Sequence, residues 1–245
     1  MEEIQSPNHK LAKQPASQDP FSRIFFWGVP FTVPALATGL TYLFYSVVPA
    51  QLRWLPLLLI YWATIWIFTL LYRAKRGGVF SAERFKPTLK LQGKYPWVQY
   101  LVVYGPFLYA IPLFIINYAT QLSVAMYGAI ILASVINGPS EEIYWRACLD
   151  DAGKNAGVSE RKRLAFAPAA FAFWHTAFVI HLYPWDASWF LAWAGILFMT
   201  WTSGFVWLWT MHRSGRLVPQ CLYHACANFL NIFPMILITV LHFYF

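Results

Sequence analysis

Long runs of apolar residues are the feature that most restricts how this chain can fold. An α-helix needs about 20 predominantly apolar residues to cross the hydrocarbon core of a bilayer. These runs predict an all-α, polytopic transmembrane bundle of about seven spanning helices. We expect Pro30 and Pro34 to break the first helix, and Gly138-Pro139 to interrupt the fourth. The runs lie at 24–48, 54–72, 97–118, 122–149, 164–182, 189–211 and 218–243.

The composition favours the same fold class. Of the 245 residues, 59% are hydrophobic and 11% are charged, whereas an ordinary soluble domain has about 25% charged residues. A chain with so few charges cannot cover the surface of a soluble fold. We expect a single transmembrane domain over 24–245, preceded by a polar cytoplasmic tail of residues 1–23.

The net charge of +8 comes mainly from the connections between apolar runs. All but Arg53 and Arg146 of the 18 lysine and arginine residues lie in the tail or in alternate connections. The positive-inside rule places these segments in the cytoplasm, and with them the N-terminus. The charge therefore indicates topology rather than binding of nucleic acid. The basic stretch 73–94 fits either an amphipathic segment on the inner leaflet or a solvated loop.

Three of the apolar runs carry polar residues at positions where lipid would make them costly. At a rise of 1.5 Å per residue, each group lies roughly 12–18 Å from the cytoplasmic end of its helix. The matched depth predicts one shared site; the alternative is a polar network that only joins the helices. The residues are Glu141, Glu142 and Arg146 in the fourth run, His175 in the fifth, and His224 and Asn228 in the seventh.

Helical spacing assigns partners within each run. Glu142 and Arg146 are four residues apart, which places them on one helix face where they can pair. Glu141 then points about 100° away and stays free for another task. By the same spacing, the ring of Phe171 can pack on His175 in the fifth run, and the two polar residues of the seventh run share a face.

These residue types fit hydrolysis without a covalent nucleophile or a cofactor. A glutamate and a histidine in a dry pocket can hold a water molecule and deprotonate it. A second histidine and an amide can polarise a carbonyl and stabilise its oxyanion. A zinc site made of Glu141, His175 and His224 is the alternative, although the positive charge of Arg146 would oppose a bound cation.

The three patterns EExxxR (Glu141-Glu142 to Arg146), FxxxH (Phe171 to His175) and HxxxN (His224 to Asn228) occur in this order. Over about residues 122–240, in the last four helices, the chain resembles the CPBP (Abi) family, which includes the type II CAAX prenyl endopeptidases. The resemblance implies a glutamate-type intramembrane protease with a site open to the cytoplasm. It implies that Glu141 and His175 activate the water, that His224 and Asn228 form the oxyanion site, and that Glu142 and Arg146 support the pocket.

The resemblance also indicates the kind of substrate. It implies a membrane protein or lipidated peptide cut near one end, by processing of the CAAX type or of the C-terminal sorting or bacteriocin type. The short tail and compact length favour a prokaryotic inner membrane. Two other classes remain open: a non-enzymatic immunity or scaffold protein with the same fold, and a proton-coupled transporter, since buried glutamate and histidine also form proton relays.

Overall fold

The computed structural model describes residues 19–49, 52–77, 79–86, 96–182, 189–234 and 236–238. Throughout these residues the regular structure is helical, as the sequence predicts. Two segments are π-helical, η2 and η3, and each follows directly on an α-helix. The elements are α1 (Pro20–Tyr42), α2 (Trp54–Arg76), α3 (Pro96–Tyr104), α4 (Phe107–Asn117), α5 (Val124–Glu141), η2 (Glu142–Cys148), α6 (Leu149–Asn155), α7 (Glu160–Leu182), α8 (Trp189–Ser214), α9 (Val218–Ala227) and η3 (Asn228–Ile232).

The all-α membrane bundle is confirmed, but the expected count of seven spanning helices is not. Among the described residues, five helices are long and apolar enough to cross a membrane. The run predicted at 97–118 is divided into the short helices α3 and α4 by a turn at Gly105-Pro106. The predicted run 122–149 forms α5 and η2 and continues into α6 without a break. The five spans are Pro20–Tyr42, Trp54–Arg76, Glu160–His181, Trp189–Ser214 and Val218–Ile238.

The expected breaks at proline are wrong. Helix α1 continues through Pro30 and Pro34, and α5 continues through Pro139 to Glu141. Within a bundle, neighbouring helices and local adjustment of the backbone can satisfy the groups that a proline leaves free. In α5 the next turn stays closed, because the backbone N–H of Glu142 donates to the carbonyls of Gly138 and Pro139.

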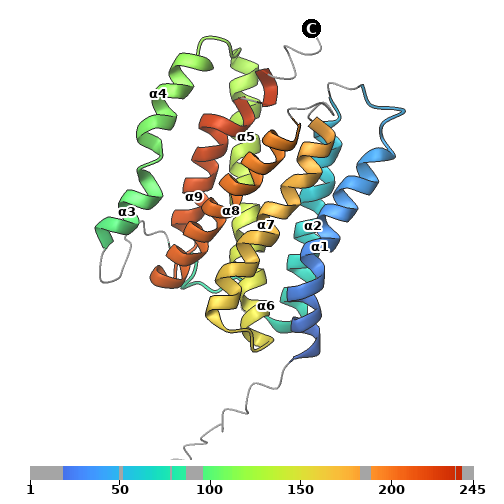
Figure 1. The fold of residues 1–245 in the computed structure, drawn as a ribbon, viewed down its shortest axis with the longest axis vertical. Helices are drawn as coiled ribbons and strands as arrows, with labels where there is room; N and C mark the ends of the chain where they lie inside the picture. Colours follow the sequence, from blue (N-terminus) through green and yellow to red (C-terminus); the bar gives the residue numbers. More distant parts are fainter. Residues whose placement is uncertain are drawn as a thin grey trace, which may run out of the picture.

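Helix α5 leaves one apolar face exposed along much of its length, but its C-terminal end, which carries the first pattern, is buried in the bundle. It packs against α2 and α9, while α7 and α8 form a hairpin that also contacts η2 (Figure 1). Helix α1 packs between α2 and α7 on the opposite side from α4 (Figure 1). The polar residues predicted on three separate runs are therefore carried by elements that contact one another.

One glycine sets how closely α5 and α9 approach. A Cβ atom on Gly138 would lie 2.6 Å from the backbone nitrogen of Ala225 and 2.9 Å from its Cα atom. Because only a residue without a side chain fits there, the two backbones touch at this point. The contact lies one turn from Glu141 and beside His224, so it brings these two side chains together.

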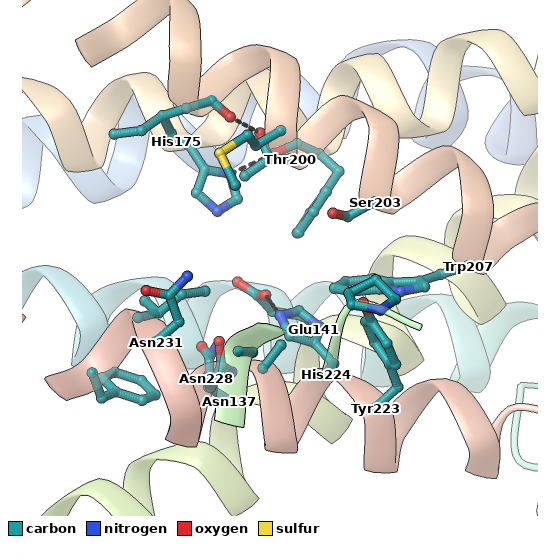
Figure 2. Close-up of a pocket in the computed structure, with 18 of the residues that line it drawn as sticks. Asn137, Glu141, His175, Thr200, Ser203, Trp207, Tyr223, His224, Asn228 and Asn231 are labelled. Atoms are coloured by element: carbon teal, nitrogen blue, oxygen red, sulfur yellow. Dashed lines mark hydrogen bonds and ion pairs between the residues drawn. The ribbon is translucent and has the colours of Figure 1, made fainter. Parts of the chain in front are cut away.

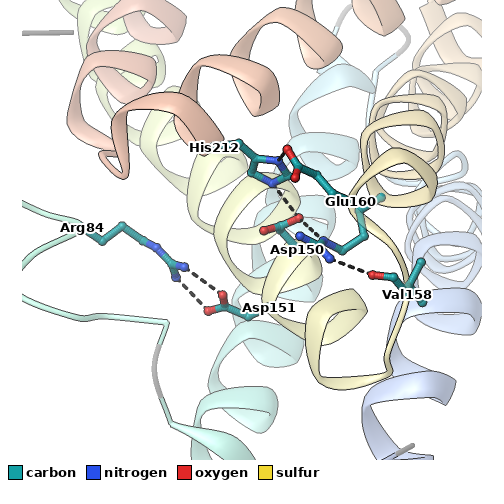
Figure 3. Close-up of polar contacts among 7 residues, drawn as sticks. Arg84, Asp150, Asp151, Val158, Glu160 and His212 are labelled. Atoms are coloured by element: carbon teal, nitrogen blue, oxygen red, sulfur yellow. Dashed lines mark hydrogen bonds and ion pairs between the residues drawn. The ribbon is translucent and has the colours of Figure 1, made fainter. Parts of the chain in front are cut away.

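Residues 73–76 of the basic stretch end α2, and its described residues 79–86 pack on the protein. Val79 is buried, and the ring of Phe80 stacks on that of Trp66 at 6.3 Å. Arg84 makes a bidentate ion pair with Asp151 of α6, with both N–O distances 2.8 Å (Figure 3). The segment therefore covers one end of the bundle, and neither alternative predicted this. The rest of the stretch, beyond 86, lies outside the described residues.

Candidate active site

His224 joins the two adjacent glutamates. Its Nε2 atom lies 3.1 Å from a carboxylate oxygen of Glu141, and its Nδ1 atom lies 2.8 Å from one of Glu142. All three side chains are buried, with at most 3% exposed. Since carboxylate oxygens only accept, both contacts are satisfied when both ring nitrogens donate, that is, when His224 is an imidazolium.

Arg146 completes the charge balance of this cluster. Its Nε atom lies 3.4 Å from the second carboxylate oxygen of Glu142, which confirms the predicted pairing. Two carboxylates, one guanidinium and one imidazolium add up to no net charge, as a site surrounded by lipid requires. The two terminal nitrogens of Arg146 have no hydrogen-bond partner among the described residues.

Aromatic rings take the place of those hydrogen bonds. The guanidinium carbon of Arg146 lies 3.9 Å from the ring centre of Phe171 and 5.0 Å from that of Trp207. Cation–π contacts of this kind stabilise a desolvated guanidinium. Gly204 of α8 leaves the space that this packing needs, because a Cβ atom there would lie 3.3 Å from a terminal nitrogen of Arg146 and 3.1 Å from Phe171.

The backbone changes its winding at two of the three patterns. The π-helix η2 begins at Glu142 and includes Arg146, and η3 begins at Asn228. A π-helical turn shifts the direction of the side chains that follow it, and such turns occur often at functional sites. Spacing rules for a regular α-helix could not predict either segment.

His175 is held in one tautomer. Its Nδ1 atom lies 3.0 Å from the backbone carbonyl of Phe171, which can only accept, so Nδ1 carries the hydrogen. In the neutral ring, Nε2 is then the acceptor. The ring of Phe171 packs edge-on against the imidazole, with centroids 4.9 Å apart and planes at 84°, which confirms the predicted contact.

A cavity of about 280 Å³ separates His175 from the glutamate cluster. Figure 2 shows the His175 ring and the Glu141 carboxylate on opposite walls, each pointing into the space between them. Side chains of α2, α4, α5, α7, α8, α9 and η3 line this cavity. Glu141, His175, His224 and Asn228 all belong to the lining, so the faces that carry the three patterns do meet.

Asn228 is 1% exposed, and neither atom of its side-chain amide has a hydrogen-bond partner among the described residues. Buried amides are nearly always paired in folded proteins. An unpaired one on the wall of a cavity therefore retains its hydrogen-bonding capacity for a ligand. Its Nδ2 group is available to a carbonyl oxygen placed in the cavity.

The support that α2 gives to the site was missed by the sequence reasoning. The indole N–H groups of Trp62 and Trp66 donate to Asn137 at 2.7 Å and to Ser140 at 2.9 Å. The hydroxyl of Tyr61 accepts from Trp145 at 2.8 Å. A signal was present, because two tryptophans four residues apart lie in mid-helix, where a buried indole N–H needs an acceptor.

Within the described residues, no group of three histidine, cysteine, aspartate or glutamate side chains has an arrangement that could hold a metal ion. The set proposed as alternative zinc ligands, Glu141, His175 and His224, does not form one. In this structure both ring nitrogens of His224 are engaged by the glutamates.

Comparison with protein families identifies the region that carries the site. Residues 123–230 match the family model of the type II CAAX prenyl endopeptidase Rce1-like proteins. The match covers less than half of the chain, so the chain is similar to this family over that segment. The matched segment contains all six predicted site residues, and the resemblance to the CPBP and CAAX proteases is confirmed. Comparison with curated proteins and with solved structures gives no match. This similarity supports a CAAX-type intramembrane endopeptidase in the general sense, and several apolar helices are long enough to embed the chain in a membrane.

Proposed function

We propose that this protein hydrolyses a peptide bond with a water molecule activated by Glu141 and His175. The observation that carries the proposal is the placement of these two side chains on opposite walls of one cavity (Figure 2). The carboxylate can take a proton, and the free Nε2 atom of His175 can accept the other hydrogen of the same water. The match of residues 123–230 to the prenyl endopeptidase family model supports proteolysis as the reaction.

The proposed hydrolysis needs one water molecule and side chains of this protein. The water oxygen adds to the scissile carbonyl carbon while its proton passes to the Glu141 carboxylate. Asn228 donates its unpaired Nδ2–H to the oxyanion that forms. The same proton then moves from Glu141 to the leaving nitrogen, the C–N bond breaks, and the carboxylate is restored.

His224 has a second possible task besides holding the glutamates. The family resemblance implies that it assists Asn228 at the oxyanion, whereas its Nε2 atom lies 3.1 Å from Glu141 in this structure. Both tasks are compatible if the Nε2–H is shared between Glu141 and the substrate oxygen in the transition state. Glu142 and Arg146 then act by keeping the imidazolium charged and in place.

The substrate we propose is a membrane-associated protein or lipidated peptide cut near one end. The positive-inside pattern supports a cytoplasmic N-terminus and a site that opens to the cytoplasmic side. A prokaryotic inner membrane is the proposed location. The cavity wall supports an apolar substrate segment, because most of its lining residues are apolar or aromatic.

Comparison of protein termini in membranes containing wild type or Glu141→Ala tests this proposal. We expect uncleaved forms of a few membrane-associated proteins to accumulate only with the variant. An unchanged set of termini, together with retained biological activity of Glu141→Ala, would instead support a non-enzymatic immunity or scaffold role. Loss of cleavage on treating wild type with a strong zinc chelator would favour the zinc alternative.

A further inference from the structure

The cavity holds three asparagine side chains beside Glu141, and the proposed attack uses only Asn228. Asn137 lies four residues before Glu141 on α5, and Asn231 lies three residues after Asn228 on η3. All three line the cavity, and Figure 2 shows them grouped on the wall opposite His175. The chemistry derived above leaves Asn137 and Asn231 without a role.

The orientation of the Asn137 amide is fixed by α2. Trp62 donates its indole N–H to Oδ1 of Asn137 at 2.7 Å, so this end of the amide is the carbonyl. The opposite end carries two N–H donors, and it belongs to a side chain that lines the cavity. Asn137 is only 7% exposed. A donor held in one direction at the wall of a cavity is available to a ligand that can accept from it.

The cavity wall around these amides shows what such a ligand must be. Lysine and arginine do not occur among the described residues that line it, and the imidazolium of His224 is already engaged by Glu141 and Glu142, so the lining offers no free cationic partner for an anion. A neutral side-chain amide both donates and accepts, and its natural complement is another amide, such as a peptide bond. The apolar part of the wall suits apolar side chains, and it includes Leu58, Phe178, Ile196, Met199, Phe233 and Ile236.

A protease inside a membrane must also provide hydrogen-bond partners for the backbone of its substrate. A peptide must leave its helix before a carbonyl can be attacked, and each N–H and C=O group released in an apolar environment then needs a partner. Side-chain amides placed next to the attacking group can supply those partners. An extended strand presents such groups at a spacing of about 3.3 Å per residue, which several amides along one wall can engage.

We propose that Asn137 and Asn231 form a backbone-binding subsite for an extended, apolar stretch of peptide next to the bond that is cut. Asn137 donates to a carbonyl of the peptide, and Asn231 both donates and accepts. The inference rests on the proposed function only in treating this peptide as the substrate. The subsite binds the backbone of the peptide and does not require a prenyl group or a terminal carboxylate.

Peptide binding to Glu141→Gln protein in detergent tests the subsite apart from cleavage. The probe is a fluorescent, unprenylated octapeptide of apolar residues, measured by anisotropy. We expect Asn231→Leu and Asn137→Leu each to raise Kd about tenfold, the effect of one lost hydrogen bond. Asn117→Leu is the matched control, because Asn117 is an exposed asparagine at the end of α4 that does not line the cavity, and the Kd of this variant should stay within about twofold of the parent protein.

A second probe shows whether the backbone itself is bound. Methylation of the peptide nitrogens, one at a time, should weaken binding at one or two positions. At the position paired with Asn231, methylation should have no further effect on Asn231→Leu, as coupled partners require. Because Asn231 is exposed in the cavity, this variant should fold even if Asn137→Leu does not.

The outcomes separate the two proposals. Equal Kd values for Asn231→Leu and Asn117→Leu, or binding that needs a prenyl group and ignores N-methylation, would overturn the subsite. Absence of cleavage by wild type, with the expected Kd pattern intact, would overturn the proposed hydrolysis and leave the subsite standing.

Discussion

At the scale of single residues, the site depends on which atoms are already engaged. Both nitrogens of His224 face carboxylates, and Nδ1 of His175 faces a backbone carbonyl. Of the groups used in the proposed attack, Nε2 of His175 lies opposite the ring atom that bonds the backbone, and both atoms of the Asn228 amide are without a partner among the described residues. A free acceptor and a free donor on one cavity are what activation of water and stabilisation of an oxyanion need.

Asn228→Ala should lower kcat by about 10²–10³ and change KM by only a few fold. The reason is that an oxyanion donor acts mainly in the transition state. Steady-state cleavage by purified protein is the measurement. A rise in KM with unchanged kcat would show instead that Asn228 only binds the substrate in its ground state.

The sequence predicted the residues of the site better than their contacts. The pairing of Glu142 with Arg146 followed from four-residue spacing and is confirmed. The contact of His224 with both glutamates could not be predicted, because it depends on how α5 and α9 pack and on the π-helix that begins at Glu142. The unpaired state of Asn228 likewise appears only when every neighbour is in place.

At the scale of elements, a tight contact between α5 and α9 sets the geometry of the site. The backbones meet at Gly138, one turn before Glu141. Small residues allow such close approach between helices in membranes. The sequence suggested an interruption at Gly138-Pro139 because glycine and proline usually end soluble helices, whereas here the glycine serves packing and the helix continues.

Gly138→Ala should destabilise the protein by about 1–3 kcal/mol, the usual effect of overpacking, and should reduce cleavage strongly. The added methyl group would lie 2.6 Å from the Ala225 nitrogen, so α9 must shift and carry His224 away from Glu141. Melting in detergent and cleavage rate are the two measurements.

Gly128→Ala is the matched control on the same helix, since a Cβ atom there has no neighbour within 4 Å. It should keep both stability and activity. Equal melting temperatures and equal cleavage rates for Gly138→Ala and Gly128→Ala would show that the close approach at Gly138 does not position the site.

At the scale of the whole molecule, two of the charge networks bear on the helix that carries the site. The buried cluster around Glu142 is neutral as a set, and a second network joins the ends of α6, α7 and α8 (Figure 3). In that network Asp150 lies 2.8 Å from Arg163 and 2.9 Å from His212, and His212 also lies 3.4 Å from Glu160. Because α6 continues directly from η2, this network fixes the helix that carries the site.

Asp150 should make the free energy of unfolding depend on pH. Burial alone would raise the pKa of Asp150, but hydrogen bonds and charge from His212 and Arg163 lower it below its ordinary value. A carboxyl with a lowered pKa in the folded state stabilises the protein above its unfolded pKa of about 3.9, and this contribution is lost as pH falls through the folded pKa.

Asp150→Asn should therefore lower the melting temperature at pH 7, with a loss of about 3 kcal/mol for a buried pair that loses one partner. The gap between wild type and variant should shrink as pH falls below about 4. Thermal melting in detergent over a series of pH values measures this. A gap that stays constant down to pH 3 would contradict the assigned role of Asp150.

The same scale shows the limits of prediction from runs of apolar residues. Helices α1, α2, α7 and α8 were predicted closely, since each is a single long run with polar ends. The run 97–118 was wrong as one helix, because composition cannot distinguish one span from α3 and α4 joined by a turn. Composition also counts the tryptophans of α2 as apolar residues. Their contribution to the site became clear only from the acceptors of their indole N–H groups, Asn137 and Ser140.

Cleavage by purified Glu141→Gln protein tests most directly whether Glu141 activates the water. The substrate is a fluorogenic peptide with a CAAX-type end, used with and without a prenyl group, and each protein is assayed with and without a strong chelator. We expect wild type to cleave in the presence of chelator, and Glu141→Gln to melt within a few degrees of wild type but to give no detectable product. Full activity of folded Glu141→Gln would contradict the mechanism.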